Sequence, residues 1–539
     1  MEKRQDRGRR NEARYGAGRW AGQRCGALAM MLALAPASAS CQGLALADAL
    51  RLALANNPAI AIHGAQLESA AGRAQQVAGL FDSRVFSRID YEKIVTPLSA
   101  GALARADPGQ AGETRLFATG YQVGIDKQLR NGLLVSSALT ASRRDEAPNT
   151  HAALGVSKLD VTLTVPLLQG RAGADLRGTE EAARLAVQAR RYDLLDRTAR
   201  TLHDTLIAYW VYRTRAELEG VAASSEERSA GLLRSIEKLV EASEKPRADL
   251  VLLQADLAEK RGMREATRLA LADARTSLGR ILGLEPVAIG ALGPARDELP
   301  VAGPASTGQL APPARLAQQA LERRPDVQSL ALQLAALQRQ LDVAGEALKP
   351  RLDLSLGLAH TKVGEGGGRY RFIGEAGRTA SAPSLFAHLN LQLPLENNSA
   401  GGAVRERAAI VSEMAIRQRD LQHGVASGVD SALTALASSV VQLEAARRAL
   451  AMYEQAVAQE IIKQKNGIST LIDVINTEAR FVSARTNLLQ ARLAHASALA
   501  RLRLETGTLL PIATGERFTL DLAGLAGLGP LSDGATISP

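Results

Sequence analysis

Residue types that usually carry catalysis or bind metals are few in this chain and widely separated. None of its seven histidines has the His-Glu-x-x-His spacing with which a helix holds zinc. Gly366-Gly367-Gly368 lacks the Lys-Ser/Thr pair of a phosphate-binding loop, and Gly170-Arg171-Ala172-Gly173 lacks the three-glycine spacing of a dinucleotide fingerprint. A serine nucleophile elbow is also absent. We therefore expect a protein that is not an enzyme and that binds no cofactor or metal.

The N-terminus is typical of a secretory signal. Basic residues precede a short apolar run, Ala27–Ala35, and Ala37-Ser38-Ala39 fits the small-residue cleavage pattern. We expect a signal peptide over residues 1–40. Of the two cysteines, Cys41 then remains alone, which excludes an intrachain disulfide in the mature chain. Cys41 lies where a lipoprotein cysteine would lie, so lipidation there and ordinary cleavage both stay open.

The net charge of +9 is unevenly distributed along the chain. Residues 1–40 hold eight Lys and Arg against three acidic residues, a net +5, so the remainder carries +4. That charge is ordinary for so long a chain, and no basic stripe interleaved with aromatic residues appears. The sequence therefore predicts no nucleic-acid partner.

Two segments of the chain recur in the same order. Asp48–Pro58 returns as Arg315–Pro325 at an offset of 267 residues, and Leu159–Leu167 returns as Ala387–Leu395 at an offset of 228. Strand-like segments follow each first echo, and each second echo leads into a long Ala- and Leu-rich helical stretch. The sequence predicts a first repeat over 41–283, a proline-rich linker over 284–314, a second repeat over 315–507 and a C-terminal tail over 508–539.

Alternating apolar and polar residues mark six candidate strands. In Leu159–Val165 every odd residue is apolar and every even one is polar, which gives one face of each kind. The Asn131-Gly132 pair favours a tight hairpin between the second and third strands. His388 lies on the polar face of the last strand, where a pore-lining position is expected rather than a metal ligand. The candidates are Val85–Tyr91, Thr119–Lys127, Leu133–Ala141, Leu159–Val165, Leu352–Leu358 and Ala387–Leu393.

Very long helices follow the strands in both repeats. The stretch Ala174–Ser243 holds no proline and could extend on the order of 100 Å. A second long helix is expected from about Gly402 to Lys465, and the last helix ends near Gly507. Apolar residues in these stretches recur every three or four positions, the coiled-coil spacing. No segment after the signal has 18 uninterrupted apolar residues, so we expect no transmembrane helix there.

These elements together predict an assembly of several chains. Two-faced strands that approach bilayer-spanning length cross a membrane only in a closed barrel. The chain has four such strands at equivalent places in the two repeats, plus an extra hairpin in the first, and four strands cannot enclose a lumen. The sequence therefore predicts a homo-oligomeric tube, part β-barrel and part helical barrel.

The sequence resembles the outer-membrane efflux protein family of the TolC type over about residues 44–507. The resemblance implies a mainly α fold with a membrane β-barrel portion: a homotrimer whose 12-stranded β-barrel lies in outer-membrane lipid and continues as an α-helical periplasmic barrel. It implies a passive exit duct of a tripartite efflux or type I secretion system, joined to an inner-membrane transporter by a periplasmic adaptor protein. The likeness is carried by Asn57-Pro58, Arg324-Pro325, Pro166-Leu167, Pro394-Leu395, Asn466-Gly467, Leu471–Ala479 and Glu505-Thr506-Gly507.

The resemblance also implies where docking surfaces and the entrance lie. The turns after the long helices would be periplasmic tips that dock the adaptor. Tip candidates are Lys245, Pro246 and Arg247 in the first repeat and Asn466, Gly467, Ile468 and Ser469 in the second. The family constricts its entrance with polar residues just inside the tips, and each such residue could instead be a solvated coiled-coil position. The gate candidates are Asp473, Asn476, Glu478, Gln254 and Asp256.

The two tips are not equivalent in sequence. Aligning Ile472–Glu478 with Leu250–Asp256 places Gly467 opposite Lys245, so the first repeat departs from the glycine turn. Gly467 suits a turn that needs positive φ. We therefore expect the glycine turn in the second repeat only.

A secreted, periplasmic structural coiled-coil protein without channel activity is the alternative. It accounts for the long helices but not for two-faced strands at matching places in both repeats. A periplasmic adaptor would need a lipoyl-like β-domain between two helices, and the sequence holds none.

Overall fold

A computed structural model describes residues 43–103, 112–147, 153–242, 246–300, 312–365 and 379–510. The expected signal peptide, Cys41, Lys245 and nearly all of the expected tail lie outside these residues. The helices are α1 (Leu46–Asn56), α2 (Pro58–Ala78), η1 (Gly79–Phe81), α3 (Ala100–Leu103), η2 (Arg171–Gly173), α4 (Ala174–Glu241), α5 (Ala248–Ile281), α6 (Pro286–Gly290), α8 (Pro313–Arg323), α9 (Pro325–Glu346), α10 (Asn398–Lys465) and α11 (Leu471–Glu505). The strands are β1 (Ser83–Pro97), β2 (Glu113–Gln128), β3 (Leu134–Ala147), β4 (Leu154–Pro166), β5 (Arg351–Glu365) and β6 (Thr379–Gln392).

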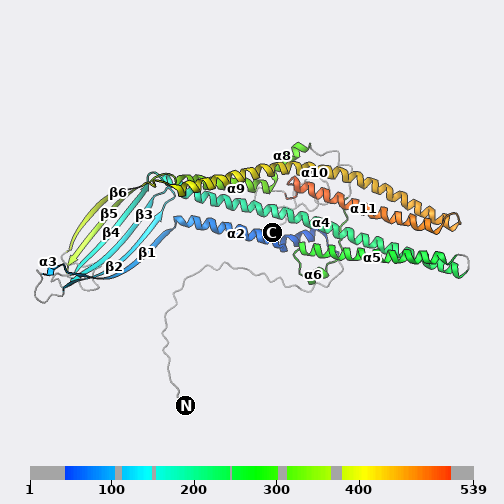
Figure 1. The fold of residues 1–539 in the computed structure, drawn as a ribbon, viewed down its shortest axis with the longest axis horizontal. Helices are drawn as coiled ribbons and strands as arrows, with labels where there is room; N and C mark the ends of the chain where they lie inside the picture. Colours follow the sequence, from blue (N-terminus) through cyan, green and yellow to red (C-terminus); the bar gives the residue numbers. More distant parts are fainter. Residues whose placement is uncertain are drawn as a thin grey trace, which may run out of the picture. The chain divides into compact units, whose positions relative to one another are not determined.

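The two halves of the chain build the same elements in the same order (Figure 1). Helices α1 and α8 have 11 residues each, and their first residues are separated by the offset found in the sequence. The long helices α4 and α10 have 68 residues each, and α5 and α11 have 34 and 35. The strands lie beyond one end of these helices, and the C-terminal ends of α4 and α10 lie at the other. The predicted mainly α fold with duplicated helix, strand and long-helix units is confirmed.

All six predicted strands form, and each is longer than its sequence pattern indicated. They make one antiparallel sheet in the described residues, in the order β1-β2-β3-β4-β5-β6. The β2–β3 hairpin is the segment that the first repeat has in addition. At its turn Gly132 takes φ +86°, and the Leu129 amide donates to the Leu133 carbonyl at 2.8 Å. Positive φ is a conformation that glycine adopts without steric cost, which accounts for the Asn-Gly signal.

One face of the sheet is apolar from edge to edge. Paired residues across successive strands join Val123 to Leu139, Leu139 to Leu159, and Val161 to Leu358 and then Leu385. These side chains are all exposed. Pairs on the opposite face are polar, such as Gln122 with Thr140, Thr164 with Ser355, and Ser355 with His388. The predicted two-faced character therefore extends across all six strands.

The helical core centres on α4, which packs against α9, α5, α2 and α11. Leu202, Leu206 and Tyr209, three of its heptad positions, are fully buried beside Trp210. The Tyr209 hydroxyl accepts hydrogen bonds from the backbone amides of Arg296 and Asp297, at 3.1 and 3.0 Å, and burial raises its pKa to about 12. This hydroxyl therefore fixes the described part of the linker to the core.

One described helix, α10, is long and apolar enough to cross a bilayer by length and composition. Its apolar stretch packs partly within the chain, because Val425 and Val429 are buried against α8, and Leu436 against α11. Much of the remaining surface of this stretch is exposed small residues. The expectation of no further membrane-spanning helix is thus qualified on length and composition, and only 28% of the most apolar window of α10 is buried in the described chain.

Each repeat joins its short helices to the end of its last long helix. In the first repeat the Asn57 side chain accepts a hydrogen bond from the Ala59 amide, 2.9 Å, and so caps α2. The same side chain donates to the Ile281 carbonyl at the end of α5, 2.7 Å. Gly283 follows with φ +70°, and a side chain there would collide with the backbone of Asn56. The Asn-Asn-Pro signal is therefore half of a helix-to-helix joint.

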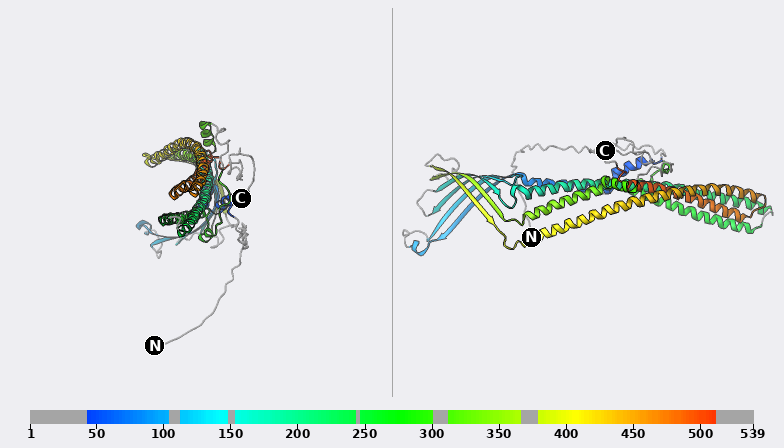
Figure 2. Two further views of the ribbon diagram at one scale, coloured as in Figure 1. Left: turned by 90° about the vertical axis from the view of Figure 1, so that its right-hand side faces the viewer. Right: turned by 90° about the horizontal axis from the view of Figure 1, so that it is seen from above.

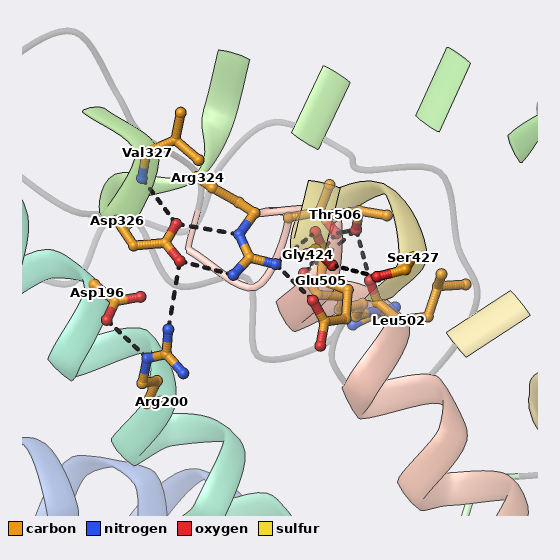
Figure 3. Close-up of polar contacts among 12 residues, drawn as sticks. Asp196, Arg200, Arg324, Asp326, Val327, Gly424, Ser427, Leu502, Glu505 and Thr506 are labelled. Atoms are coloured by element: carbon orange, nitrogen blue, oxygen red, sulfur yellow. Dashed lines mark hydrogen bonds and ion pairs between the residues drawn. The ribbon is translucent and has the colours of Figure 1, made fainter. Parts of the chain in front are cut away.

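The second repeat builds the equivalent joint with charges (Figure 3). Arg324 stands where the repeat offset places the counterpart of Asn57. It donates to Glu505 at the end of α11, at 2.5 Å, and to both carboxylate oxygens of Asp326, at 3.1 and 2.7 Å. Arg200 of α4 also reaches Asp326, at 3.4 Å. The joint thus ties α4, α9 and α11 together.

These charges are mostly withdrawn from solvent, with 12% of the Arg324 side chain and 15% of the Asp326 side chain exposed. Burial alone would raise the pKa of Asp326. The hydrogen bond and charge of Arg324, with a smaller contribution from Arg200, outweigh burial and hold that pKa below its ordinary value of 3.8. The carboxylate therefore stabilises the fold above that ordinary pKa, and the contribution is lost as the pH falls through the lowered value.

Gly507 offers a test of the second joint. It takes φ +68°, and a Cβ there would lie 3.2 Å from the Arg323 backbone. We expect Gly507→Ala to destabilise the fold by about 1–2 kcal/mol, because a left-handed conformation is costly for any residue with a Cβ. Gly64→Ala is the matched control: this helical glycine has open space around it, so the change should stabilise by about 0.5–1 kcal/mol. Thermal unfolding of both purified variants measures the two shifts, and equal shifts would contradict the role of Gly507.

Asp326→Asn tests the charged joint by its pH dependence. At neutral pH we expect the variant to be less stable by about 3 kcal/mol, because Arg324 keeps its burial and loses a charged partner. The difference in unfolding midpoint between variant and native protein should shrink as the pH falls below 3.8, and it should vanish once the pH has passed the lowered pKa at which the native carboxylate becomes protonated. A difference that stays constant down to pH about 2 would rule out the ion pair as its source.

Candidate gate and docking tip

The turn between α10 and α11 is a closed, glycine-dependent tip. Gly467 takes φ +72°, and a Cβ on this residue would meet open space, so the backbone conformation alone favours glycine here. The Gly467 amide donates to the Gln464 carbonyl at 3.1 Å, and the Ile468 amide donates to the Lys463 carbonyl at 2.9 Å. These bonds satisfy the last carbonyls of α10. Ile468 leaves the turn with 77% of its surface exposed, an apolar side chain presented to solvent.

The start of α11 is fixed by a reciprocal cap. The Asp473 carboxylate accepts from the Thr470 amide at 3.1 Å and from the Thr470 hydroxyl at 2.6 Å, while the Asp473 amide donates to that hydroxyl at 3.3 Å. Hydrogen bonds from Thr470, the side chain first, lower the pKa of Asp473. Ser469 donates to Glu460 across the turn and lowers the pKa of that carboxyl in turn. Asp473, predicted as a gate residue, therefore also has a structural role as the cap of a helix.

The tip of the first repeat is built differently. Pro246 and Arg247 are exposed, and their carbonyls accept from the amides of Asp249 and Leu250, both at 3.2 Å. Lys245 lies outside the described residues, so its position in this tip stays a prediction. The structure has the glycine turn and the capping box in the second repeat, as the sequence alignment of the two tips led us to expect for the turn.

Two of the predicted gate residues meet at one groove just inside the tips. Asp256 of α5 accepts from the Ser229 hydroxyl at 2.6 Å and lies 3.6 Å from the Lys260 ammonium. Glu478 of α11 accepts from the guanidinium of Arg228. The groove they line has a volume of about 480 Å³ and is bounded by α4, α5, α10 and α11.

The two carboxylates occupy equivalent positions of the two repeats and reach adjacent residues of α4. Both are partly buried, whereas Gln254 and Asn476 are exposed and, like Asp473, do not line this groove. The structure thus brings together Asp256 and Glu478 out of the five gate candidates. The polar groups here tie α5 and α11 to α4 just inside the tips.

Sequence reasoning missed the partners Arg228, Ser229 and Lys260. Arg228 and Glu478 are 250 positions apart, so no local pattern links them. The alignment of the two repeats did contain a signal, since it paired Asp256 with Glu478 and so indicated a shared environment. In the residues that the structure describes, no group of His, Cys, Asp and Glu is placed to hold a metal ion.

The family model for outer membrane efflux protein matches residues 316–508. No curated protein sequence matches the chain. Among solved structures, the Campylobacter jejuni CmeC outer membrane channel superposes with a TM-score of 0.65 at 14% identity, over 86% of this chain and 85% of that one.

Two further solved channels show the same likeness in fold. The outer-membrane channel OprN gives a TM-score of 0.63 at 19% identity, over 86% of this chain and 90% of that one. The open state of the Neisseria gonorrhoeae MtrE outer membrane channel gives 0.59 at 14% identity, over 86% of this chain and 88% of that one.

The cap of α11 can be tested without reference to transport. We expect Asp473→Ala to increase hydrogen exchange over the first turn of α11, because the loss of an N-terminal cap costs about 1 kcal/mol. Thr470→Ser is the matched control, because it keeps the hydroxyl that accepts from the Asp473 amide. Exchange measured by mass spectrometry should change in the first variant and stay near the native rate in the control. Native rates in both would show that the cap does not hold this turn.

Proposed function

We propose that this chain is an outer membrane efflux protein and forms one third of a homotrimeric exit duct, and the family match over residues 316–508 and the fold support this proposal. It resides in the outer membrane and extends into the periplasm. In the proposed system the duct is passive, an inner-membrane transporter supplies the energy, and a periplasmic adaptor joins the two. The halves 41–283 and 315–507 are the two efflux repeats of each protomer.

The observation that carries this proposal is a sheet with one apolar face and two open edges. Exposed Val85, Leu139, Leu358 and Leu389 lie on that face, and water would not stabilise so continuous an apolar surface. A bilayer would, provided that every backbone N–H and C=O is paired. Edge strands β1 and β6 leave such groups open within one chain, so further copies are needed to close the barrel.

The helical part supports the same arrangement. Viewed along their length, the long helices follow an arc (Figure 2). Exposed apolar residues on them, such as Ile416, Val441 and Met452 of α10, have no partner helix within the described chain. Neighbouring protomers in a helical barrel would cover such residues. The alternative, a structural coiled coil without channel activity, gives the sheet no role.

The groove inside the tips is the gate in this proposal. Arg228 with Glu478, and Ser229 and Lys260 with Asp256, hold α11 and α5 against α4 and narrow the entrance. Outward movement of these helices would break the polar contacts and widen it. Adaptor binding at the second-repeat tip, where Ile468 is exposed, would favour that movement.

Planar bilayer recordings test the duct and its gate together. We expect the purified native protein to give small, stable conductance steps, and Asp256→Ala combined with Glu478→Ala to raise the step severalfold. Glu265→Ala is the control, because this exposed carboxylate of α5 pairs only with Arg268 on its own helix. A native protein that inserts no pore would contradict the duct. Equal conductance in the double variant would remove these carboxylates from the gate.

Adaptor docking is tested at Ile468. We expect Ile468→Ser to reduce the yield of adaptor cross-linked to the duct in whole cells, because an exposed apolar side chain is lost from the contact. The change avoids backbone strain, unlike Gly467→Val, which should reduce the yield further by disturbing the φ +72° turn. Mass spectrometry of the cross-linked bands measures both. An unchanged yield in Ile468→Ser would place docking elsewhere.

A further inference from the structure

The two edges of the sheet are suited to each other. β1 and β6 run in opposite directions, because six strands alternate in order. In each edge strand one phenylalanine leans inward over a glycine of the next strand, Phe86 over Gly124 and Phe386 over Gly357. Neither ring covers the open side of its strand. Both edges are therefore free to accept an antiparallel neighbour.

The internal repeat shows how such a neighbour would pair. β4 is the strand that leads to the long helix of the first repeat, and β5 is the strand that follows the short helices of the second. Their pairing is a junction between one repeat and the next within the chain. β6 and β1 are the counterparts of β4 and β5, so the junction between β6 of one copy and β1 of the next joins repeats in the same order.

The offsets of the repeats transfer the register from one junction to the other. Adding 228 to a β4 residue gives its β6 counterpart, and subtracting 267 from a β5 residue gives its β1 counterpart. Both offsets keep apolar positions on the apolar face. The pair Val161 and Leu358 becomes Leu389 and Tyr91, and Leu163 with Leu356 becomes Leu391 and Ile89.

We propose that β6 of one copy pairs with β1 of a second copy of this chain in this register, with Leu389 opposite the partner's Tyr91. Three such seams close a barrel of eighteen strands, since each chain contributes six. The proposal rests on the proposed function for the number of copies. It differs from the twelve strands that the family resemblance implied, because the β2–β3 hairpin adds two strands to the wall in every copy.

Exposure of the edge residues supports a neighbouring strand at this edge. Leu391, Leu393 and Leu395 are 62%, 60% and 93% exposed. Their first-repeat counterparts Leu163, Val165 and Leu167 are half-buried, because β5 and the backbone before it lie beside them. In particular, the Leu167 amide donates to the Leu352 carbonyl at 2.8 Å, beyond the end of β4. The transferred register gives the Leu395 amide the same bond, to the partner's Val85 carbonyl.

The polar face is compatible with the same seam. It places Gln392 opposite the partner's Arg88, Asn390 opposite the partner's Asp90, and His388 opposite the partner's Glu92. Each pair combines a hydrogen-bond donor with an acceptor, and no like charges face each other. A slip by one residue would instead place Leu391 and Leu389 opposite polar side chains of the other face.

An eighteen-stranded wall has a wider lumen than a twelve-stranded one. With strands about 4.8 Å apart and tilted by about 40°, the backbone cylinder is roughly 36 Å across rather than roughly 24 Å. The outer-membrane part of the duct would then admit bulkier cargo, such as a polypeptide with helical structure. The periplasmic gate, rather than the barrel, would set the size limit.

Cysteine cross-linking tests the register. Under mild oxidation we expect Leu389→Cys with Tyr91→Cys to give covalent products of two and three chains, because directly opposite residues satisfy disulfide geometry. The shifted pairs, Leu389→Cys with Ile89→Cys and Leu389→Cys with Lys93→Cys, are matched controls on the same face. Each single variant reports any background from Cys41.

Each outcome of this cross-linking decides a separate point. Stronger cross-linking in a shifted pair would overturn the register and leave the duct standing. Products that stop at two chains would overturn the eighteen-stranded barrel. No product in any pair, from a protein that is monomeric in detergent, would instead overturn the proposed function.

Fluorescence tests whether the hairpin belongs to the wall. We expect brominated lipids to quench Val123→Trp on the apolar face of β2 strongly and Gln122→Trp on its polar face weakly. The buried Trp210 provides a constant background. Equal quenching of the two variants would place the hairpin outside the lipid-facing wall and return the barrel to twelve strands.

Discussion

The pairing of backbone hydrogen-bonding groups in lipid is the constraint on which the rest of the molecule depends. A strand can cross a bilayer only if both of its sides are paired, and the described part of a single chain leaves one side of β1 and one side of β6 open. Closure therefore has to come from other copies. In the proposed duct, protomers held together by strands in the membrane would also share one helical wall beneath it.

Duplication supplies most of the internal order. The joints at Asn57 and at Arg324 have the same role. Each links the start of the helix that leads into a strand, α2 or α9, to the end of the last long helix of its repeat, α5 or α11. One uses an amide and a carbonyl, and the other uses buried charges. Burying the charges of the second joint costs more desolvation energy, but this joint holds α4, α9 and α11 together at once. It also lies beside α10, because Glu505 is next to Gly428 of that helix.

Much of this fold is predictable from the sequence, and the reasons are physical. Apolar and polar residues alternate in Leu159–Val165, and apolar residues recur every three or four positions in α4. These spacings indicate which side of each element is apolar, so the strand faces and the helices could be predicted. Strand ends could not, since the outer residues of β1 and β5 are held by pairing rather than by hydrophobic pattern. The polar contacts of the candidate gate could be predicted only in part. Asp256 and Glu478 were predicted as gate candidates from the family resemblance, whereas Arg228 meets its partner only through tertiary packing. For Asp473 the sequence did not reveal its capping role, because Thr470 was not recognised as an N-cap.

The inserted hairpin creates a symmetry mismatch inside each protomer. The first repeat contributes four strands to the sheet and the second contributes two, yet each also contributes a long helix of 68 residues. Long helices of equal length therefore connect to different numbers of strands in the two repeats. In the first repeat, the connection from β4 to α4 contains the η2 turn, where Gly170, Ala172 and Gly173 all take positive φ. In the second repeat, the connection from β6 to α10 has one described residue with positive φ, Asn397. In the proposed trimer, that compact kink is where the chain would pass from two helices of equal length to unequal numbers of strands.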